Sequence, residues 1–314
     1  MGHAIGVDIG GTKVAAGVVD ETGRILRETR RQTPNDDAEA ALDAVVEVVH
    51  ELAPDDDVDA VGVAAAGYVS ADRTTMLFAP NLPWSNVPVR DYVGARVDVP
   101  VVVENDANAA AWAEYRFGAG RNESVLVCLT IGTGIGAGIV LDGSLFRGRW
   151  GIAGEPGHMC AVIDGVPCGC GNRGCLEQYA SGTALTRYAR EHAARDPDSA
   201  SRMLDLAEGG EIQGPHVTAA AREGDPLAVA AFAVIGRWLG RGLADLAAVL
   251  DPGTFVIGGG VADAGELLLG PTRESFADCL SGATHRPVAA IRPALLGNDA
   301  GLVGAADLAR SAVR

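Results

Sequence analysis

The stretch "VDIGGTKVAAGVVD" at residues 7–20 decides the fold, because two apolar runs flank a glycine turn. Residues 4–20 predict two strands joined at Gly10-Gly11. A second stretch, "LTIGTGIGAGIVLDG" at residues 129–143, aligns without a gap with residues 7–21. The similarity predicts a duplicated domain in which each half offers one turn to a shared cleft. Chance similarity between two glycine-rich hairpins is the alternative.

Strands and helices alternate along the rest of the chain, which predicts an α/β fold with a mixed sheet. The further predicted strands are 24–33, 58–66, 99–104 and 254–260, and the predicted helices are 36–53, 89–97 and 226–250. The final segment, "GNDAGLVGAADLAR", is expected to be helical and to return to the first domain.

The composition excludes several classes of function. The 314 residues carry a formal net charge of −16, which argues against a nucleic-acid-binding surface. Apolar residues make up 48% and charged residues 21%, as in a globular protein with a full core. No run approaches 18 apolar residues, and the N-terminus lacks the features of a signal peptide, so a cytoplasmic protein without a membrane partner is expected.

Three glycine-rich turns follow predicted buried strands and suit phosphate binding. They are "DIGGTK" (8–13), "GTGIGAG" (132–138) and "IGGGV" (257–261). Glycines let main-chain N–H groups approach an anion, and Lys13, the only lysine of the chain, adds a charge. A single turn of this kind is more often a plain hairpin. Three together favour a nucleotide phosphate site, although neither the P-loop nor the dinucleotide fingerprint is present.

Two aspartates are candidates for chemistry beside these turns. Asp8 ends the first strand, where a carboxylate can hold Mg²⁺ through water, with turn capping as the alternative. In "VVVENDANAAA" (101–111) the strand ends in Glu104, Asn105 and Asp106, where α/β sheets place ligand contacts. Capping of the next helix is the alternative for Asn105 and Asp106. Phosphoryl transfer to a hydroxyl usually uses one carboxylate as proton acceptor, and Asp106 is the candidate.

The stretch "CGCGNRGC" (168–175) holds three of the six cysteines. With a histidine upstream it gives the pattern H-x₉-C-x-C-x₄-C, which predicts a closed, structural zinc site. A disulfide would leave one of the three cysteines unpaired and suits the cytosol poorly, and a redox centre would normally use C-x-x-C. The predicted zinc ligands are His158, Cys168, Cys170 and Cys175.

The metal would hold two loops that carry Glu155, His158 and Glu177. Carboxylates and an imidazole on a rigid backbone can bind several sugar hydroxyls at once. Surface acids in contact with solvent are the alternative for Glu155 and Glu177.

In order and spacing, these motifs resemble the ROK family of sugar kinases and sugar-responsive repressors. They are "VDIGGTKVAAGVVD", "ENDANAAAWAEY", "IGTGIGAGIVLDG", "GEPGH", "CGCGNRGCLE" and "IGGGV". The likeness covers essentially the whole chain and is greatest to bacterial ATP-dependent glucokinases. It implies an actin-like, ribonuclease-H-like ATPase fold of two α/β domains around a cleft. The small domain would be residues 1–103 plus 298–314, and the large one 104–297 with the zinc site.

The resemblance also implies roles for single residues. Asp106 matches the catalytic base that activates the sugar 6-hydroxyl. The matching sugar-binding positions are Gly67, Asn105, Asp106, Glu155, His158 and Glu177. The matching ATP-binding positions are Asp8, Gly11, Thr12 and Lys13 in the first phosphate loop, Gly132, Thr133 and Gly134 in the second, and Gly258 and Gly259 on the adenosine side. Pro156 departs from the family pattern, because relatives commonly carry a larger apolar residue there, and its fixed φ is expected to bear on the fit of the sugar around Glu155.

The implied activity is that of an ATP-dependent glucokinase, with Mg²⁺ and a structural zinc ion, that forms glucose 6-phosphate and ADP. Its expected partners are glucose, ATP and further copies of the chain, in a dimer or tetramer. One alternative is a kinase for N-acetylglucosamine, N-acetylmannosamine or fructose, and polyphosphate is an alternative donor. A further alternative is a sugar-sensing regulator that binds DNA. It is disfavoured because the seven residues before Asp8 leave no room for a helix-turn-helix and because the triplet Glu104-Asn105-Asp106 is intact.

Overall fold

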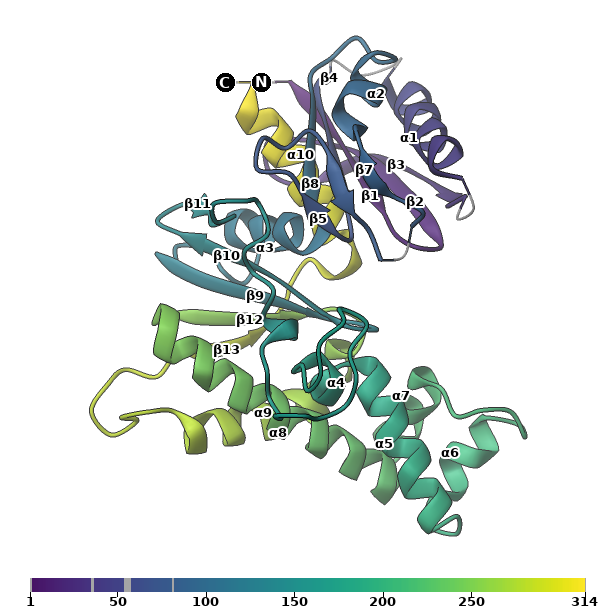
Figure 1. The fold of residues 1–314 in the computed structure, drawn as a ribbon, viewed down its shortest axis with the longest axis vertical. Coiled ribbons are helices and arrows are strands. Elements are labelled where there is room, and N and C mark those ends of the chain that lie inside the picture. Colours follow the sequence, from purple (N-terminus) through teal and green to yellow (C-terminus); the bar gives the residue numbers. More distant parts are fainter. Residues whose placement is uncertain (1, 35–36, 54–57, 81, 314) are drawn as a thin grey trace. The chain divides into compact units, whose positions relative to one another are not determined.

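The computed structural model describes residues 2–34, 37–53, 58–80 and 82–313 (Figure 1). Its mixed α/β architecture agrees with the class predicted from the sequence. The strands are β1 (His3–Ile9), β2 (Lys13–Val19), β3 (Ile25–Gln32), β4 (Val58–Ala65), β5 (Tyr68–Val69), β6 (Met76–Phe78), β7 (Ser85–Val87), β8 (Val101–Asn105), β9 (Val125–Ile131), β10 (Ile135–Leu141), β11 (Ser144–Leu145), β12 (Thr254–Gly258) and β13 (Ala290–Pro293).

Each of the predicted helices has a counterpart in the structure; residue 36, the first of the range 36–53, lies outside the described residues. They are α1 (Ala38–Leu52), α2 (Val89–Gly94), α3 (Asp106–Phe117), α4 (Glu177–Ala180), α5 (Gly182–Arg195), α6 (Ser201–Leu206), α7 (Gly214–Arg222), α8 (Pro226–Leu250), α9 (Glu266–Cys279) and α10 (Ala300–Ala312). Single 3₁₀ turns are η2 (Pro156–His158), η3 (Ala262–Ala264) and η4 (Gly297–Asp299).

The chain forms two compact units. The first unit comprises Met1–Ser124, Gly138–Gly154 and Leu295–Arg314, and the second comprises Val125–Ala137 and Glu155–Ala294. The domain boundaries at 103/104 and 297/298 stay a prediction. The compact units differ from them in placing α3 with the first sheet, where it packs against α10.

The first unit is built on a five-stranded sheet of order β3-β2-β1-β4-β8. Strands β1, β4 and β8 are parallel, and their register places Asp8 level with Ala64 and Glu104. Side chains alternate between the two faces of a strand. Ile5, Val7 and Ile9 of β1 therefore share one core with α1 and α2, and Ala4 lies in another with α3 and α10.

Helix α10 lies unusually close to the sheet (Figure 1). A Cβ on Gly6 of β1 would meet the carbonyl oxygen of Leu302, and one on Gly62 of β4 would meet that of Ala305. The two glycines thus let the helix backbone contact two adjacent strands. The predicted return of the C-terminal segment to the strands of 4–20 is seen as this contact.

The second five-stranded sheet has the order β11-β10-β9-β12-β13, and the boundary between the units falls within β10. Strands β9, β12 and β13 are parallel. The β9–β10 hairpin takes the place that the β1–β2 hairpin takes in the first sheet, with β12 and β13 in the places of β4 and β8. The two sheets therefore share one strand order, as the aligned glycine hairpins predict.

Helix α8 is long and apolar enough to cross a membrane by length and composition alone, with a mean hydropathy of 1.4. In the structure 56% of that window is buried, and the helix packs against α5 and α9 (Figure 1). Asp225 caps its start by accepting the N–H groups of Leu227 and Ala228. Its packing is that of a core helix.

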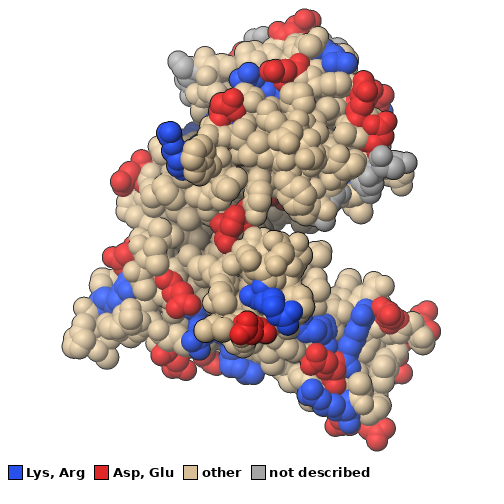
Figure 2. Space-filling model, in the orientation of Figure 1, with Lys and Arg blue, Asp and Glu red and all other residues tan. Residues whose placement is uncertain are grey.

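Charged side chains of both signs are interspersed on the face drawn in Figure 2, where they form no continuous basic surface. Exposed ion pairs in the described residues include Arg190–Glu211 at 2.8 Å and Arg202–Glu223 at 2.5 Å. Such pairs contribute little to stability.

Gly62→Ala should destabilise the protein by about 3 kcal/mol, because the new Cβ would force α10 away from β4. The matched control is Gly94→Ala in α2, where the nearest atom to a new Cβ is Val101 Cγ2 at 3.8 Å. Urea unfolding measures both. Equal stabilities for the two variants would contradict the close contact.

Candidate active site

The turn between β1 and β2 carries Gly11, Thr12 and Lys13. The Gly10 N–H donates to the Lys13 carbonyl at 2.9 Å and closes the turn. Thr12 and Lys13 are exposed, so their side chains are available to a ligand.

Gly67, Asn105 and Asp106 come together where β4 and β8 end. Asn105 caps α3 by accepting the Asn108 N–H at 2.9 Å, and its side-chain amide donates to the Gly67 carbonyl at 3.0 Å. Gly67 has φ +142°, and a Cβ there would meet the Phe78 carbonyl. Asp106 is the first residue of α3, so Asn105 and not Asp106 is the cap. Capping leaves the Asp106 carboxylate available for chemistry.

The two candidate aspartates of this unit, Asp8 and Asp106, have raised pKa values. The pKa of Asp8 is raised to about 7, chiefly by burial and also by the charge of Asp106, while Lys13 opposes the rise. Burial also raises the pKa of Asp106, against the main-chain N–H of Ala107, which donates to its Oδ1 at 2.8 Å. Two carboxyl groups with raised pKa values at strand ends are typical of a functional site.

Sequence reasoning placed Glu104 at the end of β8 without giving it a partner. It is 2% exposed, and its Oε2 accepts Arg147 Nη2 at 2.6 Å, with Arg73 Nε 3.5 Å away. Its Oε1 accepts the Asn105 N–H at 3.2 Å and Asn108 Nδ2 at 3.1 Å. The pairing ties the strand end that carries Asn105 to two loops of the same unit. The sequence did hold a signal for this pairing: Glu104 is a lone acid in the apolar run "VVVEN", and a buried charge needs a partner.

In the second unit, the turn between β9 and β10 carries Gly132, Thr133 and Gly134. The start of α5 holds it: the Gly182 N–H donates to the Gly132 carbonyl and the Thr183 hydroxyl to the Thr133 carbonyl, both at 2.8 Å. This turn is therefore fixed from outside as well as by its own strands.

The predicted metal ligands form one cluster. One donor atom from each of His158, Cys168, Cys170 and Cys175 lies within 4.8 Å of the others. The Cys170 and Cys175 sulfurs are 3.7 Å apart, as are Cys168 Sγ and His158 Nδ1. A tetrahedral zinc ion with Zn–S bonds of about 2.3 Å spaces its ligand atoms about 3.7 Å apart. The cluster fits zinc, and a disulfide would need sulfurs about 2.05 Å apart.

Acidic side chains adjoin this cluster. The Cys168 thiol donates to Glu177 Oε1 at 3.1 Å, and His158 Nδ1 lies 3.9 Å from the same oxygen. Glu155 precedes η2, whose first residue is the buried Pro156. Proline is favoured at a first helical position, so this departure from the family pattern fits the local turn. Glu177 thus contacts the cluster of His158 and the three cysteines, and Glu155 directly precedes the turn that carries His158.

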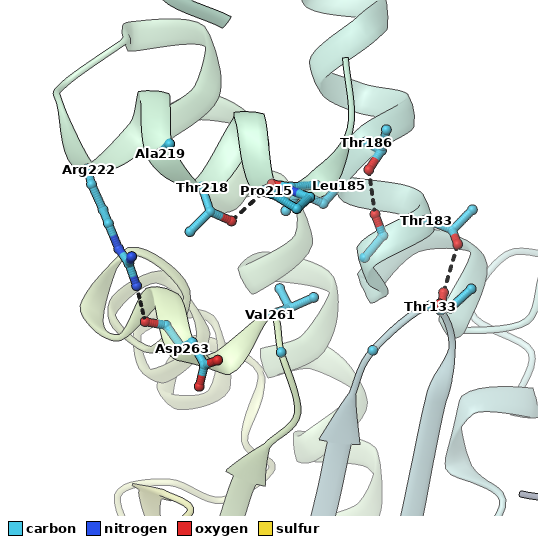
Figure 3. A pocket seen from close by; sticks show the side chains of 14 residues that line it. Thr133, Thr183, Leu185, Thr186, Pro215, Thr218, Ala219, Arg222, Val261 and Asp263 are labelled. Atoms are coloured by element: carbon cyan, nitrogen blue, oxygen red, sulfur yellow. Dashed lines mark hydrogen bonds between the residues drawn. The ribbon is translucent and has the colours of Figure 1, made fainter. Parts of the chain in front are cut away.

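A cavity of about 590 Å³ opens beside the second hairpin (Figure 3). Arg222 closes one end by donating to the Asp263 carbonyl at 2.7 Å, and Thr183 bonds Thr133 at the other. It is lined by Gly132, Thr133, Gly182, Thr183, Leu185, Thr186, Gly214, Pro215, Thr218, Ala219, Arg222, Gly260, Val261 and Asp263.

Sequence reasoning found only part of this cavity. Gly132 and Thr133 line it, whereas Gly134, Gly258 and Gly259 are not among its described lining residues. Gly259 has φ +84° and packs against Ile131, next to the lining residues Gly260 and Val261. The residues from α5 and α7 were missed, because a Thr on an amphipathic helix gives no signal of a ligand.

The sequence profile of the ROK family matches residues 4–312. The chain belongs to the ROK family. This confirms the family resemblance and, through the solved ROK kinases, the predicted fold class.

Three ROK relatives are informative. A glucokinase from Streptomyces coelicolor is 52% identical over 312 residues, which cover 99% of this chain and 98% of the relative. A ROK family glucokinase from Streptomyces griseus, solved in complex with glucose and AMPPNP, is 54% identical with a TM-score of 0.91, covering 99% of this chain and 100% of that one. An N-acetylmannosamine kinase from Yersinia pseudotuberculosis is 36% identical, covering 100% of both chains.

The pKa of Asp8 makes the stability of this ROK protein depend on pH. Since its folded-state pKa of about 7 lies above the ordinary 3.8, folding favours the protonated carboxyl. The stabilisation is complete below about pH 4 and is lost as the pH rises through about 7. Between pH 5 and pH 8 the wild type should lose about 3 kcal/mol of unfolding free energy that Asp8→Asn keeps.

Urea unfolding at both pH values measures the difference. Asp278→Asn, which changes an exposed acid of α9, is the control and should follow the wild type. Parallel pH profiles for wild type and Asp8→Asn would contradict the raised pKa.

Proposed function

We propose that this chain is an ATP-dependent glucokinase, which transfers the γ-phosphate of ATP to the 6-hydroxyl of glucose and forms glucose 6-phosphate and ADP. The observation that carries the proposal is the similarity along the whole chain to glucokinases, one of them solved with glucose and AMPPNP. A carboxylate at the end of β8, two glycine hairpins and a cavity beside one of them support it.

Asp106 is the proposed base. Burial raises the pKa of its carboxyl, which makes the ionised form a better proton acceptor at neutral pH. In the reaction it takes the proton of the 6-hydroxyl while the oxygen attacks the γ-phosphorus and ADP leaves. Gly67 and Asn105, held together at 3.0 Å, provide polar main-chain and side-chain groups beside it for sugar hydroxyls. The resemblance adds Glu155, His158 and Glu177 to the proposed sugar ligands.

The cavity of the second unit is proposed to hold the nucleoside of ATP. Its lining mixes apolar groups of Leu185, Pro215 and Val261 with threonine hydroxyls, which suits a base and a ribose. The turns at Gly11–Lys13 and Gly132–Gly134 would bind phosphates through main-chain N–H groups. Gly258 and Gly259 would support the adenosine side from the end of β12.

Asp8 is the proposed ligand for Mg²⁺, through water. Its carboxyl is an oxygen donor whose pKa is raised by burial and by the neighbouring Asp106, and a cation beside both would relieve the repulsion between the two carboxylates. A bound Mg²⁺ ion would neutralise negative charge on the phosphates of ATP.

Zinc is proposed for the cluster of His158 and three cysteines. Four protein ligands leave no open position, so the ion would be structural. Burial raises the pKa of the Cys175 thiol to about 12, so a metal is needed to hold it as the thiolate at neutral pH.

Several finer properties stay predictions. The N-acetylmannosamine kinase relative makes another hexose the second candidate substrate. Polyphosphate as donor, a sugar-sensing role, a cytoplasmic location and a dimeric or tetrameric state rest on the sequence and the resemblance.

Sugar-dependent ADP release with Mg-ATP tests the activity, over glucose, fructose, N-acetylglucosamine and N-acetylmannosamine. We expect glucose to be the best acceptor. Asp106→Asn should lower kcat by about 10³-fold and keep glucose binding, because it removes the proton acceptor and little else. Asp278→Asn is the control. Normal turnover by Asp106→Asn would remove Asp106 from this role, and turnover with only an N-acetylated sugar would correct the substrate.

Metal analysis should give about one zinc per chain in the wild type and little in Cys170→Ser. The variant should also unfold at a lower temperature, because the loops between Glu155 and Glu177 lose their clamp. Cys279→Ser, which changes an exposed cysteine of α9 outside the cluster, should keep both properties. A full zinc content in Cys170→Ser would show that this cysteine is not a ligand.

A further inference from the structure

Each glycine hairpin is held by a threonine from outside it. In the first unit, Thr33 follows β3 and is 7% exposed. Its hydroxyl donates to the Gly10 carbonyl at 2.7 Å, and its N–H donates to the Thr12 carbonyl at 3.1 Å. One residue thus fixes two carbonyl groups of the β1–β2 turn.

The second unit repeats the arrangement at the start of α5. The Thr183 hydroxyl donates to the Thr133 carbonyl at 2.8 Å, and the Gly182 N–H donates to the Gly132 carbonyl at 2.8 Å (Figure 3). Gly182 also needs its lack of a side chain, because a Cβ there would lie 2.7 Å from the Gly132 carbonyl oxygen. The contact therefore brings the helix backbone directly against the hairpin.

These anchors determine where the hairpin N–H groups point. In a planar trans peptide the C=O of one residue and the N–H of the next point in opposite directions. Anchoring the Gly10 carbonyl turns the Gly11 N–H away from Thr33. Anchoring the Gly132 and Thr133 carbonyls does the same for the N–H groups of Thr133 and Gly134.

The same peptide is anchored in both halves of the duplication. In the ungapped alignment Gly10 corresponds to Gly132, and Gly11 corresponds to Thr133. The donor differs, since a threonine hydroxyl anchors Gly10 and a main-chain N–H anchors Gly132. In both halves the anchored carbonyl sets the direction of the next main-chain N–H, which belongs to Gly11 in the first hairpin and to Thr133 in the second.

We propose that Thr33 and Thr183 are positioning residues that aim the main-chain N–H groups of the two hairpins at the phosphates of ATP. The inference rests on the proposed function, of which it specifies the donor site. Donors fixed before the ligand arrives need no reorganisation, which makes them effective at a highly charged group. Each hydroxyl acts through a carbonyl and contacts no reacting atom.

Thr33→Val and Thr183→Val test the proposal, because valine keeps the shape of threonine and removes the hydroxyl. We expect each to weaken ATP binding about 5-fold, the effect of one lost hydrogen bond. For Thr33→Val, whose residue is not among the described residues that line the nucleoside cavity, adenosine binding should stay within about 2-fold of wild type, since adenosine lacks the phosphates that the hairpins hold. In steady-state kinetics the KM for ATP should rise while that for glucose stays unchanged.

Two further variants separate positioning from stability. Thr33→Ser and Thr183→Ser keep the hydroxyl and should restore ATP affinity. Thr272→Val removes a buried hydroxyl that donates to the Leu268 carbonyl at 2.7 Å within α9, far along the chain from either hairpin, and should bind ATP as the wild type does. If Thr33→Val does not fold, the comparison of Thr183→Val with Thr183→Ser tests the inference, because only serine keeps a hydroxyl that can donate to the Thr133 carbonyl.

The outcomes are distinct. Wild-type protein that releases no ADP and binds no ATP would overturn the proposed function, and the inference with it. An active wild type whose Thr→Val variants bind ATP normally would overturn the inference alone. Equal weakening of ATP and adenosine in Thr33→Val would also overturn it, because the change would then not act through the phosphates.

Discussion

The close contact of α10 with β1 and β4 is the constraint on which the first unit depends. Gly6 and Gly62 let the helix backbone reach the sheet, and no larger residue fits there. The contact also places Gly301, near the start of α10, against the carboxylate of Asp8, where a Cβ would lie 2.8 Å from Oδ2. A C-terminal helix therefore helps to bury an acid at the end of the first strand. The raised pKa of Asp8 is the electrostatic result of that packing.

Local pattern was sufficient for much of the fold. The glycine hairpins, the apolar spacing of α1 and the capped start of α3 each lie within a short stretch, and the structure confirms all three. The sheet β5-β6-β7 was not predicted, because its strands have two or three residues and show no clear alternation. Helices α6 and α7 begin at Ser201 and Gly214, inside segments that resemble loops in composition. Short elements of this kind depend on tertiary packing.

In the candidate site, too, features within one short stretch could be predicted, and features that depend on tertiary packing could not. Residues that share a motif, such as the three cysteines, can be grouped from spacing alone, and His158 joins them because only nine residues separate it from Cys168. The ion pair of Glu104 with Arg147 joins residues 43 positions apart, and nothing in either neighbourhood names the other. Only the fold brings such partners together. Sequence reasoning therefore found the motif residues proposed to touch ligands. It missed the cavity residues of α5 and α7 and the residues that hold the motifs in place.

Two of the missed residues share a chemical type and a place. Thr33 and Thr183 each donate to a carbonyl of a hairpin, and neither lies within the motif that it supports. A glycine-rich turn has little to fix its own peptide planes, because it lacks side chains and glycine populates many conformations. The freedom that lets a phosphate approach would also let the N–H groups turn away from it. A hairpin of this kind thus requires an anchor from another segment, and each of the two hairpins has one.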